Sequence, residues 1–245
     1  MRITRVHTRG PLVDGAPFAL EPRAATHLVR VLRLQEGDRL TVFDGAGREY
    51  AATIASIRAE RVEVRLGAAQ PALPESPLEI TLAQGISRGD RMDYAIQKAT
   101  ELGVARIAPL LCERSVVKLD AEQALRKLEH WRGIAIAACE QCGRATVPEI
   151  NATRRYADYL SLGATAGVRR LVLAPQAVQS LGGLATTLER VELLIGPEGG
   201  LSDEELRLAT LTGYEALRLG PRVLRTETAA AAAIAALQTL YGDLG

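Results

Sequence analysis

From residue 78 onward, short apolar runs alternate with longer segments whose apolar positions recur at helical spacing. Short runs bounded by turn residues predict buried strands, and a period of 3.6 residues predicts helices. The strands are predicted at "LEITLAQ", "VARIAPLL", "RRLVLAP", "VELLIG" and "EALRLG". The helices are predicted at residues 91–102, 121–142, 154–162, 203–212 and 226–241. This alternation implies an α/β fold with a mostly parallel sheet covered on both faces.

The first 70 residues follow a different pattern. "RLTVFDGAG", "REYAATIASI" and "RVEVRLG" alternate roughly every second residue, with turn signals at Asp44-Gly45, so they predict short strands. One short helix is predicted from Pro22 to Leu34, with Leu28, Val31 and Leu32 on one face. Together these elements predict a small β-barrel.

A proline-rich segment separates the two patterns. "AAQPALPESPLEI" contains Pro71, Pro74 and Pro77, which indicates an extended, semi-rigid linker. The sequence therefore predicts three parts, namely a barrel over residues 1–70, a linker over 71–77 and an α/β domain over 78–245.

In open parallel sheets, ligands bind outside the carboxyl ends of the strands. The loops at those ends here are "LAPQA", "IGPEGG" and "LGPRVLRTET". In the second loop, Gly196, Gly199 and Gly200 permit positive φ and a close approach of backbone to a ligand. Ser202 and Glu205 then form a capping box that starts the next helix.

Acidic residues follow the "IGPEGG" loop, and no lysine or arginine does. A phosphate ligand is therefore disfavoured, and a neutral or cationic ligand held by backbone groups fits better. A tight strand-to-helix turn without a ligand is the alternative.

The third loop begins at the constrained turn Gly220-Pro221 and carries Arg225 and Glu227 just ahead of a helix. Thr226 is predicted to cap that helix. The run Ala229–Ala233 favours a helix, and its small surface lets neighbouring backbone pass close by.

Composition and charge add modest constraints. The chain has 245 residues, is 47% hydrophobic and 24% charged, and carries a net charge of +1, as is typical of a soluble globular protein of one or two domains. Residues 1–70 have 11 arginines against 8 acids, whereas residues 71–245 have 19 basic residues against 21 acids. The arginine excess suggests an anionic partner for the first part, and a solvated arginine-rich surface is the alternative.

We expect a cytoplasmic location and no membrane span, because no apolar run is long enough and the first ten residues lack a signal-peptide pattern.

Cys139 and Cys142 form a CxxC pattern. Metal or redox chemistry is disfavoured because no second pair and no histidine cluster accompany it. Two thiols on a helix are the simpler interpretation. His7, His27 and His130 are scattered along the chain.

With these motifs, the sequence resembles the SPOUT superfamily of S-adenosylmethionine-dependent RNA methyltransferases. It resembles in particular the RsmE type, which methylates N3 of a uridine in small-subunit (16S) ribosomal RNA. The similarity covers nearly the whole chain and includes "HLVRVLRLQEGD", "VFDGAGREY", "IQKATELGV", "ERSVVK" and "EQCGR". One departure is Cys142, where the family usually has serine.

The resemblance implies an N-terminal PUA-like RNA-binding β-barrel and a C-terminal SPOUT α/β domain with a trefoil knot. It also implies a homodimer that acts on 16S rRNA in the small ribosomal subunit. The cofactor would be S-adenosylmethionine, with no metal. The residues expected to bind it are Leu173, Ala174, Pro175, Ile195, Gly196, Glu198, Gly199, Gly200, Leu219, Gly220, Val223, Leu224, Arg225 and Thr228. The residues expected to bind RNA are Arg2, Arg5, His27, Arg30, Arg33, Arg88 and Arg114, although a surface or packing role for His27 is an equal alternative.

Methyl transfer to N3 of uracil requires loss of the N3 proton and stabilisation of the charge that spreads onto the carbonyl oxygens. Arg225 and Glu227 are the candidates for this work, and Glu227 has an equal alternative as a carboxylate at a helix start. Glu140 and Arg144 are further catalytic candidates, as groups that orient the RNA or a loop.

Two other functions remain open at this stage. A SPOUT enzyme could act on ribose 2′-oxygen or guanine N1 instead of uridine N3. A non-catalytic RNA-binding or ribosome-assembly protein could keep the same fold, although such a protein would not need the glycine loops.

Overall fold

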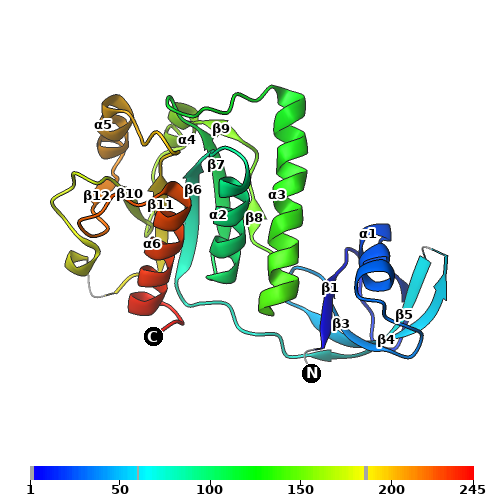
Figure 1. Ribbon diagram of the computed structural model, residues 1–245. Helices are drawn as coiled ribbons and strands as arrows, with labels where there is room; N and C mark the ends of the chain where they lie inside the picture. The colour runs from blue at the N-terminus through cyan, green and yellow to red at the C-terminus, as the bar shows by residue number, and fades with distance from the viewer. Residues whose placement is uncertain (1–2, 60, 185–186) are drawn as a thin grey trace. The chain divides into compact units, whose positions relative to one another are not determined.

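A computed structural model describes residues 3–59, 61–184 and 187–245 of the chain. The chain divides into two compact units (Figure 1). The first contains the residues up to Glu75 together with Ile136–Val147, and the second contains Ser76–Ala135 and Pro148–Gly245. The division at Glu75 lies within the predicted linker. Ile136–Val147, which the sequence assigned to the second domain, belongs to the first unit because its last residues pair with the turn at Gly45.

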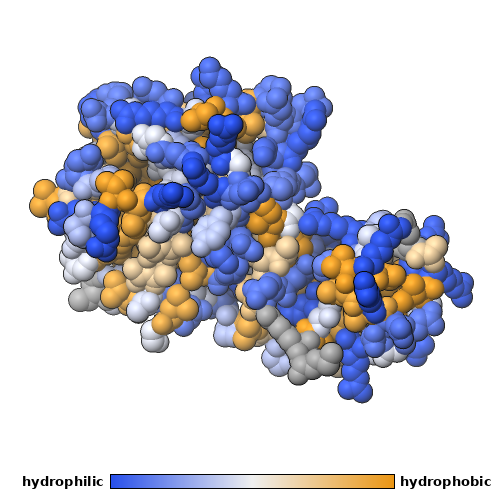
Figure 2. Space-filling model, viewed as in Figure 1, coloured by the Kyte–Doolittle hydropathy of each residue, from blue (hydrophilic) through white to orange (hydrophobic). Residues whose placement is uncertain are grey.

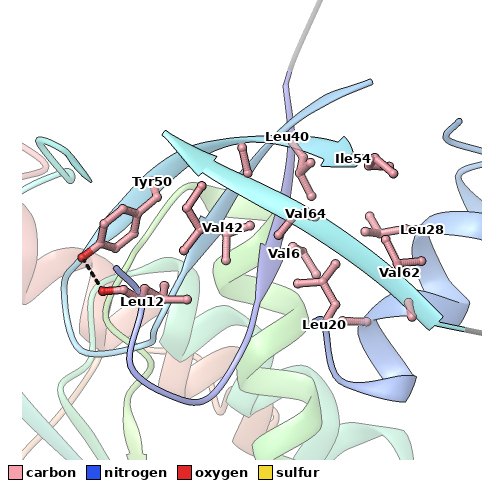
Figure 3. Packing of buried hydrophobic residues seen from close by; sticks show 14 residues of the cluster. Val6, Leu12, Leu20, Leu28, Leu40, Val42, Tyr50, Ile54, Val62 and Val64 are labelled. Atoms are coloured by element: carbon pink, nitrogen blue, oxygen red, sulfur yellow. Dashed lines mark hydrogen bonds between the residues drawn. The ribbon is translucent and has the colours of Figure 1, made fainter. Parts of the chain in front are cut away.

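A five-stranded sheet forms the core of the first unit, in the order β1-β3-β4-β5-β2. The strands are β1 Thr4–His7, β2 Pro17–Ala19, β3 Arg39–Phe43, β4 Glu49–Arg58 and β5 Arg61–Gln70. Their inward positions are mostly aliphatic, with Tyr50 among them, and side chains such as Val6, Leu40 and Val64 pack together below 2% exposure (Figure 3). The predicted turn at Asp44 is confirmed, since its Oδ1 accepts hydrogen bonds from the backbone N–H groups of Ala46 and Arg48.

The predicted helix over Pro22–Leu34 is shorter and less regular than expected. The α-helix α1 covers Pro22–Thr26, and a π-helical turn, η1, covers His27–Val31. A π-turn widens the spiral, so residues after it leave the face that α-helical spacing assigns to them. Leu28 is buried as predicted, but Val31 and Leu32 are exposed.

The second unit contains a seven-stranded sheet whose pairings are all parallel, as the sequence predicted. Its main order is β12-β10-β11-β6-β7-β8, and β9 also pairs with β7. The strands are β6 Glu79–Gly85, β7 Arg106–Leu111, β8 Glu149–Ile150, β9 Arg154–Arg155, β10 Arg169–Leu173, β11 Arg190–Ile195 and β12 Glu215–Leu217. The short strands β8 and β9 were not predicted.

Five α-helices belong to or enter this unit in the described ranges. They are α2 Asp90–Glu101, α3 Ala121–Cys142, α4 Tyr156–Leu160, α5 Asp203–Leu211 and α6 Thr226–Tyr241. A 3₁₀ turn, η2, covers Leu181–Gly183. The predicted helix at 154–162 was too long, because Arg154 and Arg155 extend the sheet beside β7.

Helices cover both faces of the sheet (Figure 1). Ala83, Val172 and Leu194 occupy paired positions on adjacent strands and pack with residues of α4 and α5. The alternating neighbours Leu82 and Leu193 point to the opposite face, on which α2 and α6 lie side by side. Both faces are therefore buried, which explains the continuous apolar runs of these strands.

The visible surface is mostly hydrophilic, and apolar side chains gather over part of the first unit, at the right of the view (Figure 2). Within the described ranges, no helix has both the length and the apolar character needed to span a membrane.

Candidate functional site: a cleft at the carboxyl edge of the sheet

A cleft of about 550 Å³ opens at the carboxyl edge of the parallel sheet in the second unit. The loops after β10, β11 and β12 form most of its walls, and Arg91 of α2 and Arg114 complete it. The volume lies within the range of small-molecule sites. All of the predicted cofactor-binding residues except Thr228 line this cleft, and so does Glu227.

Close backbone approach shapes the β11–α5 loop. A Cβ on Gly196 would lie 2.8 Å from the backbone nitrogen of Leu201, and a Cβ on Gly199 would lie 2.9 Å from Cβ of Arg114. Gly200 has a φ of +70°. The sequence predicted that these glycines shape the backbone. A larger residue would collide with neighbouring atoms at Gly196 and Gly199, whereas at Gly200 it would be strained by the positive φ.

Glu198 ties this loop to the start of α2. Its Oε1 accepts hydrogen bonds from the backbone N–H of Arg88 at 2.7 Å and from Nη1 of Arg91 at 3.0 Å. Burial alone would raise the pKa of the Glu198 carboxyl, but these hydrogen bonds and the Arg91 charge hold that pKa below its ordinary value. Glu198 is therefore ionised at neutral pH and braces the wall of the cleft.

The start of α5 is capped as the sequence predicted. The Ser202 hydroxyl accepts from the backbone N–H of Glu205, and the Glu205 carboxylate accepts from the backbone N–H of Ser202. Glu205 also accepts from the backbone N–H of Glu113 at 2.8 Å. The same carboxylate thus anchors the segment that brings Arg114 to the cleft.

Thr226 does not cap α6 as predicted. Arg225 is the N-cap residue, without a side-chain capping bond, and Thr226 is the first helical residue. The Thr226 hydroxyl instead donates to the carbonyl oxygen of Gly196 at 2.7 Å and accepts from Nε2 of Gln84 at 2.9 Å. This buried contact joins the end of strand β6 and the start of α6 to the loop after β11.

Arg225 and Glu227 stand directly before and after Thr226 in the sequence, and both line the cleft. Arg225 is exposed and Glu227 is half-buried. Within the described ranges, Oε2 of Glu227 is buried and has no hydrogen-bond partner. An unpartnered buried carboxylate oxygen is costly, so this atom is suited to accept a donor from a ligand.

The cleft is strongly cationic. Its lining holds five arginines, Arg91, Arg114, Arg218, Arg222 and Arg225, against the carboxylates of Glu198 and Glu227. Arg91 binds Glu198, and Arg114 donates to the carbonyl oxygens of Gly199 and Leu201, each at 3.3 Å. Arg114, predicted to bind RNA, is thus partly committed to the loop. Arg218 and Arg222 were missed as cleft residues, although Arg222 stands within the "LGPRVLRTET" motif.

Two predicted catalytic residues, Glu140 and Arg144, lie in the first unit and do not line the cleft. Oε1 of Glu140 accepts from the backbone N–H of His7 at 3.0 Å, and Arg144 pairs with Glu75 at 2.5 Å. Burial raises the pKa of the Glu140 carboxyl. Within the first unit these residues hold strand β1 and the chain before β6, and a catalytic role for them stays a prediction.

The predicted RNA-binding residues of the first unit differ in their exposure. The Arg5 guanidinium is 12% exposed and donates to Glu49 at 2.7 Å and to the carbonyl oxygen of Arg144 at 3.1 Å, so it is committed within the unit. His27, Arg30 and Arg33 are exposed. Arg2 lies outside the described residues, and Arg88 is an exposed residue of the second unit.

Cys139 is buried, and its Sγ donates to the carbonyl oxygen of Thr146 at 3.5 Å. Burial raises the pKa of the Cys139 thiol to about 12, so this thiol is protonated at neutral pH and is a packing residue.

Comparison with known proteins now adds to this geometry. Residues 74–238 match the model of a family described as an RNA methyltransferase domain, and residues 20–67 match one described as an RNA methyltransferase PUA domain. The chain belongs to this RNA methyltransferase family. The resemblance drawn from the sequence is therefore confirmed, including the PUA-like character of the first unit.

Relatives in this family match over nearly their full lengths. The ribosomal RNA small subunit methyltransferase E of Buchnera aphidicola subsp. Schizaphis graminum is 34% identical over 99% of this chain and 98% of its own. The protein of the same name from Bacillus subtilis is 30% identical, covering 96% of each chain.

Two solved structures are similar along the whole chain. A putative methyltransferase from Legionella pneumophila, in complex with bound S-adenosylmethionine, matches with a TM-score of 0.96 and 41% identity over 100% of both chains. A ribosomal RNA small subunit methyltransferase E from Neisseria gonorrhoeae, also bound to S-adenosylmethionine, matches with a TM-score of 0.92 and 37% identity over 100% of both chains.

Proposed function

We propose that the protein transfers a methyl group from S-adenosylmethionine to N3 of a uridine in 16S ribosomal RNA. The observation that carries this proposal is the cleft at the carboxyl edge. Its walls combine glycine-rich backbone, several arginines, and carboxylate oxygens of Glu198 and Glu227 that have no hydrogen-bond partner in the described part of the chain. Related structures of this fold hold S-adenosylmethionine, and the relatives that match over the full chain are named for small-subunit ribosomal RNA.

The cleft residues fit this cofactor. Leu173–Pro175, Ile195 and Leu219 offer an apolar slot for an adenine ring, and the glycine turn at Gly199-Gly200 brings backbone groups close to a ligand. When bound, S-adenosylmethionine supplies an electrophilic methyl group on a sulfonium. Because the cleft holds five arginines against two carboxylates, apolar and backbone contacts, and not net charge, would hold this cationic ligand.

We assign the proton transfer to Glu227 and charge stabilisation to Arg225. Oε2 of Glu227 accepts the proton from N3 of uracil. The N3 electron pair forms the new bond to the methyl carbon as the bond from that carbon to sulfur breaks and leaves its electron pair on sulfur. The Arg225 guanidinium stabilises the negative charge that spreads onto the uracil carbonyl oxygens. The products are N3-methyluridine and S-adenosylhomocysteine, with the proton left on Glu227.

The target uridine must leave its stack before it can enter the cleft. Arg218 and Arg222 stand at the cleft wall, where they would bind phosphates or base oxygens beside the target. In the first unit, exposed Arg30 and Arg33 would bind backbone phosphates of the same RNA.

We also propose the trefoil knot, a homodimer, the small ribosomal subunit as the site of action, and a cytoplasmic location. Close backbone contact supports the knot. A Cβ on Gly85, at the end of β6, would lie 2.5 Å from the nitrogen of Pro197, and α6 begins against both of these loops through Thr226.

The test is methylation of small ribosomal subunits from a strain that lacks this gene. The purified protein is incubated with isotopically labelled S-adenosylmethionine and these subunits, and the rRNA is digested for mass analysis of its nucleosides. Labelled N3-methyluridine is the expected product. A label on ribose or on guanine would overturn the N3 assignment, and RNA binding without any label would overturn the enzymatic function. Parallel reactions with naked 16S rRNA decide whether the assembled subunit is required.

A further inference from the structure

A second hollow, of about 490 Å³, lies beside the first half of α3 in the second unit. It is lined by Lys118, Leu119, Gln123, Arg126, Lys127 and His130. Three of these side chains are cationic, a fourth is a histidine, and none is a carboxylate. We call this hollow the α3 groove.

The groove occupies one face of α3. Gln123, Arg126, Lys127 and His130 stand at positions i, i+3, i+4 and i+7, a spacing that places them on one side of a helix. Leu128, Trp131 and Ala135 are buried on another side. The helix therefore already has an apolar face for the core, and its groove face is polar without any packing requirement.

Acids do not neutralise the groove fully. Arg126 pairs with Glu122 at an exposed position, and Nε2 of His130 lies 2.8 Å from Oδ2 of Asp93 on α2. Exposed ion pairs of this kind are weak and exchange readily. Lys118 and Lys127 form no ion pair within the described ranges. Residues 71–245 carry more acids than bases, so the positive groove is a local feature and not part of a generally basic surface.

The groove is also continuous in sequence with the cleft. Arg114 lines the cleft and contacts Gly199 and Leu201, whereas Lys118, four residues later, lines the groove. Four residues span at most about 14 Å of chain. A polyanion whose base enters the cleft therefore passes within reach of the groove.

We propose that the α3 groove binds phosphodiester groups of the substrate RNA next to the target nucleotide. This inference rests on the proposed function, because it takes RNA to be the substrate. Lys118 and Lys127 bind phosphates as point charges, and Arg126 exchanges Glu122 for a bidentate contact to phosphate. The groove thus supplies part of the grip on RNA within the methyltransferase unit itself.

The experiment compares the double variant Lys118→Gln/Lys127→Gln with Arg132→Gln in the full-length protein. Arg132 lies on the same helix, pairs with Glu129 and does not line the groove, so Arg132→Gln measures the effect of one surface charge lost outside the groove. Binding of a 16S rRNA fragment is measured over a series of salt concentrations, together with S-adenosylmethionine affinity and the thermal midpoint.

We expect the double variant to bind RNA roughly tenfold more weakly and to lose about 1.5 from the slope of log K against log salt, because each lost phosphate contact removes about 0.7–0.9. The RNA KM rises, while kcat, cofactor affinity and thermal midpoint stay unchanged. Wild-type affinity and slope in the double variant, or half of its loss or more in the single variant Arg132→Gln, would overturn the inference. RNA binding is the readout, so a wild-type protein that binds RNA through the groove but methylates nothing would overturn the proposed function alone.

Discussion

The Thr226 hydroxyl donates a hydrogen bond of 2.7 Å to the carbonyl oxygen of Gly196. The two residues are 30 positions apart in the sequence. Both are buried, and both line the cleft. Gln84 completes the contact by donating Nε2 to the Thr226 hydroxyl and to the carbonyl oxygen of Gly85. The start of α6 is thereby fixed against two other loops, and with it the positions of Arg225 and Glu227.

Thr226→Val removes this hydroxyl while keeping the side-chain shape. The carbonyl oxygen of Gly196 then loses its donor in a buried place, which costs about 1–3 kcal/mol of folding free energy. We expect that loss in urea unfolding, together with weaker S-adenosylmethionine binding by calorimetry. Thr226→Ser keeps the hydroxyl and should lose little of either property. A Thr226→Val variant that matches the wild type in stability and in cofactor binding would contradict the role of this hydrogen bond.

Gly85→Ala tests the close approach of β6 to the β11–α5 loop. The added Cβ would lie 2.5 Å from the nitrogen of Pro197 and 2.8 Å from the carbonyl carbon of Gly196, so backbone must move, at a cost of about 1–3 kcal/mol. We expect a lower unfolding midpoint and weaker cofactor binding. Gly182→Ala is the matched control, because its Cβ would meet nothing within 4 Å. A Gly85→Ala variant as stable as that control would show that the two loops can separate at little cost.

Glu198→Gln tests the charge that braces the cleft. In the folded protein the pKa of the Glu198 carboxyl is held below its ordinary value. In an unfolded chain the pKa of a glutamate carboxyl is about 4.3. A depressed folded pKa gives stability that is complete above the unfolded pKa and is lost as pH falls through the folded pKa. The wild type should therefore exceed Glu198→Gln in unfolding free energy at neutral pH, and the difference should vanish in acid. A difference that is constant with pH would refute the role of the charge.

Arg225→Ala and Glu227→Gln test the proposed chemistry. Loss of either group should lower kcat by about 10²-fold or more, because both act on charge that develops during transfer. S-adenosylmethionine affinity should change far less in single-turnover and binding measurements. Thr228→Val is a useful control, since Thr228 is exposed and does not line the cleft. Near-normal methylation by both variants with unchanged cofactor binding would remove the assigned roles.

The sequence alone predicted much of this protein, because the relevant interactions are local. Apolar runs marked the parallel strands, since both faces of the sheet are buried, and Ser202 with Glu205 marked the start of α5 through a capping box that spans four residues. The glycines at 196, 199 and 200 marked a loop whose backbone lies close to other segments of the protein. Strand ends in a parallel sheet meet at one edge, so the three loops were expected to converge, and they do.

The tertiary structure decided what depends on contacts between distant residues. Threonine is a common N-cap residue, but the Thr226 hydroxyl donates its hydrogen bond to a carbonyl oxygen 30 positions away. Arg5 has the residue type of a phosphate ligand, but Glu49 and the carbonyl of Arg144 hold it inside the first unit. Val31 and Leu32 fit an α-helical face, but a π-turn exposes them. For Thr226 and Arg5, a long-range contact outweighs the small free energy of local propensity, whereas for Val31 and Leu32 a change of helix geometry decides the outcome.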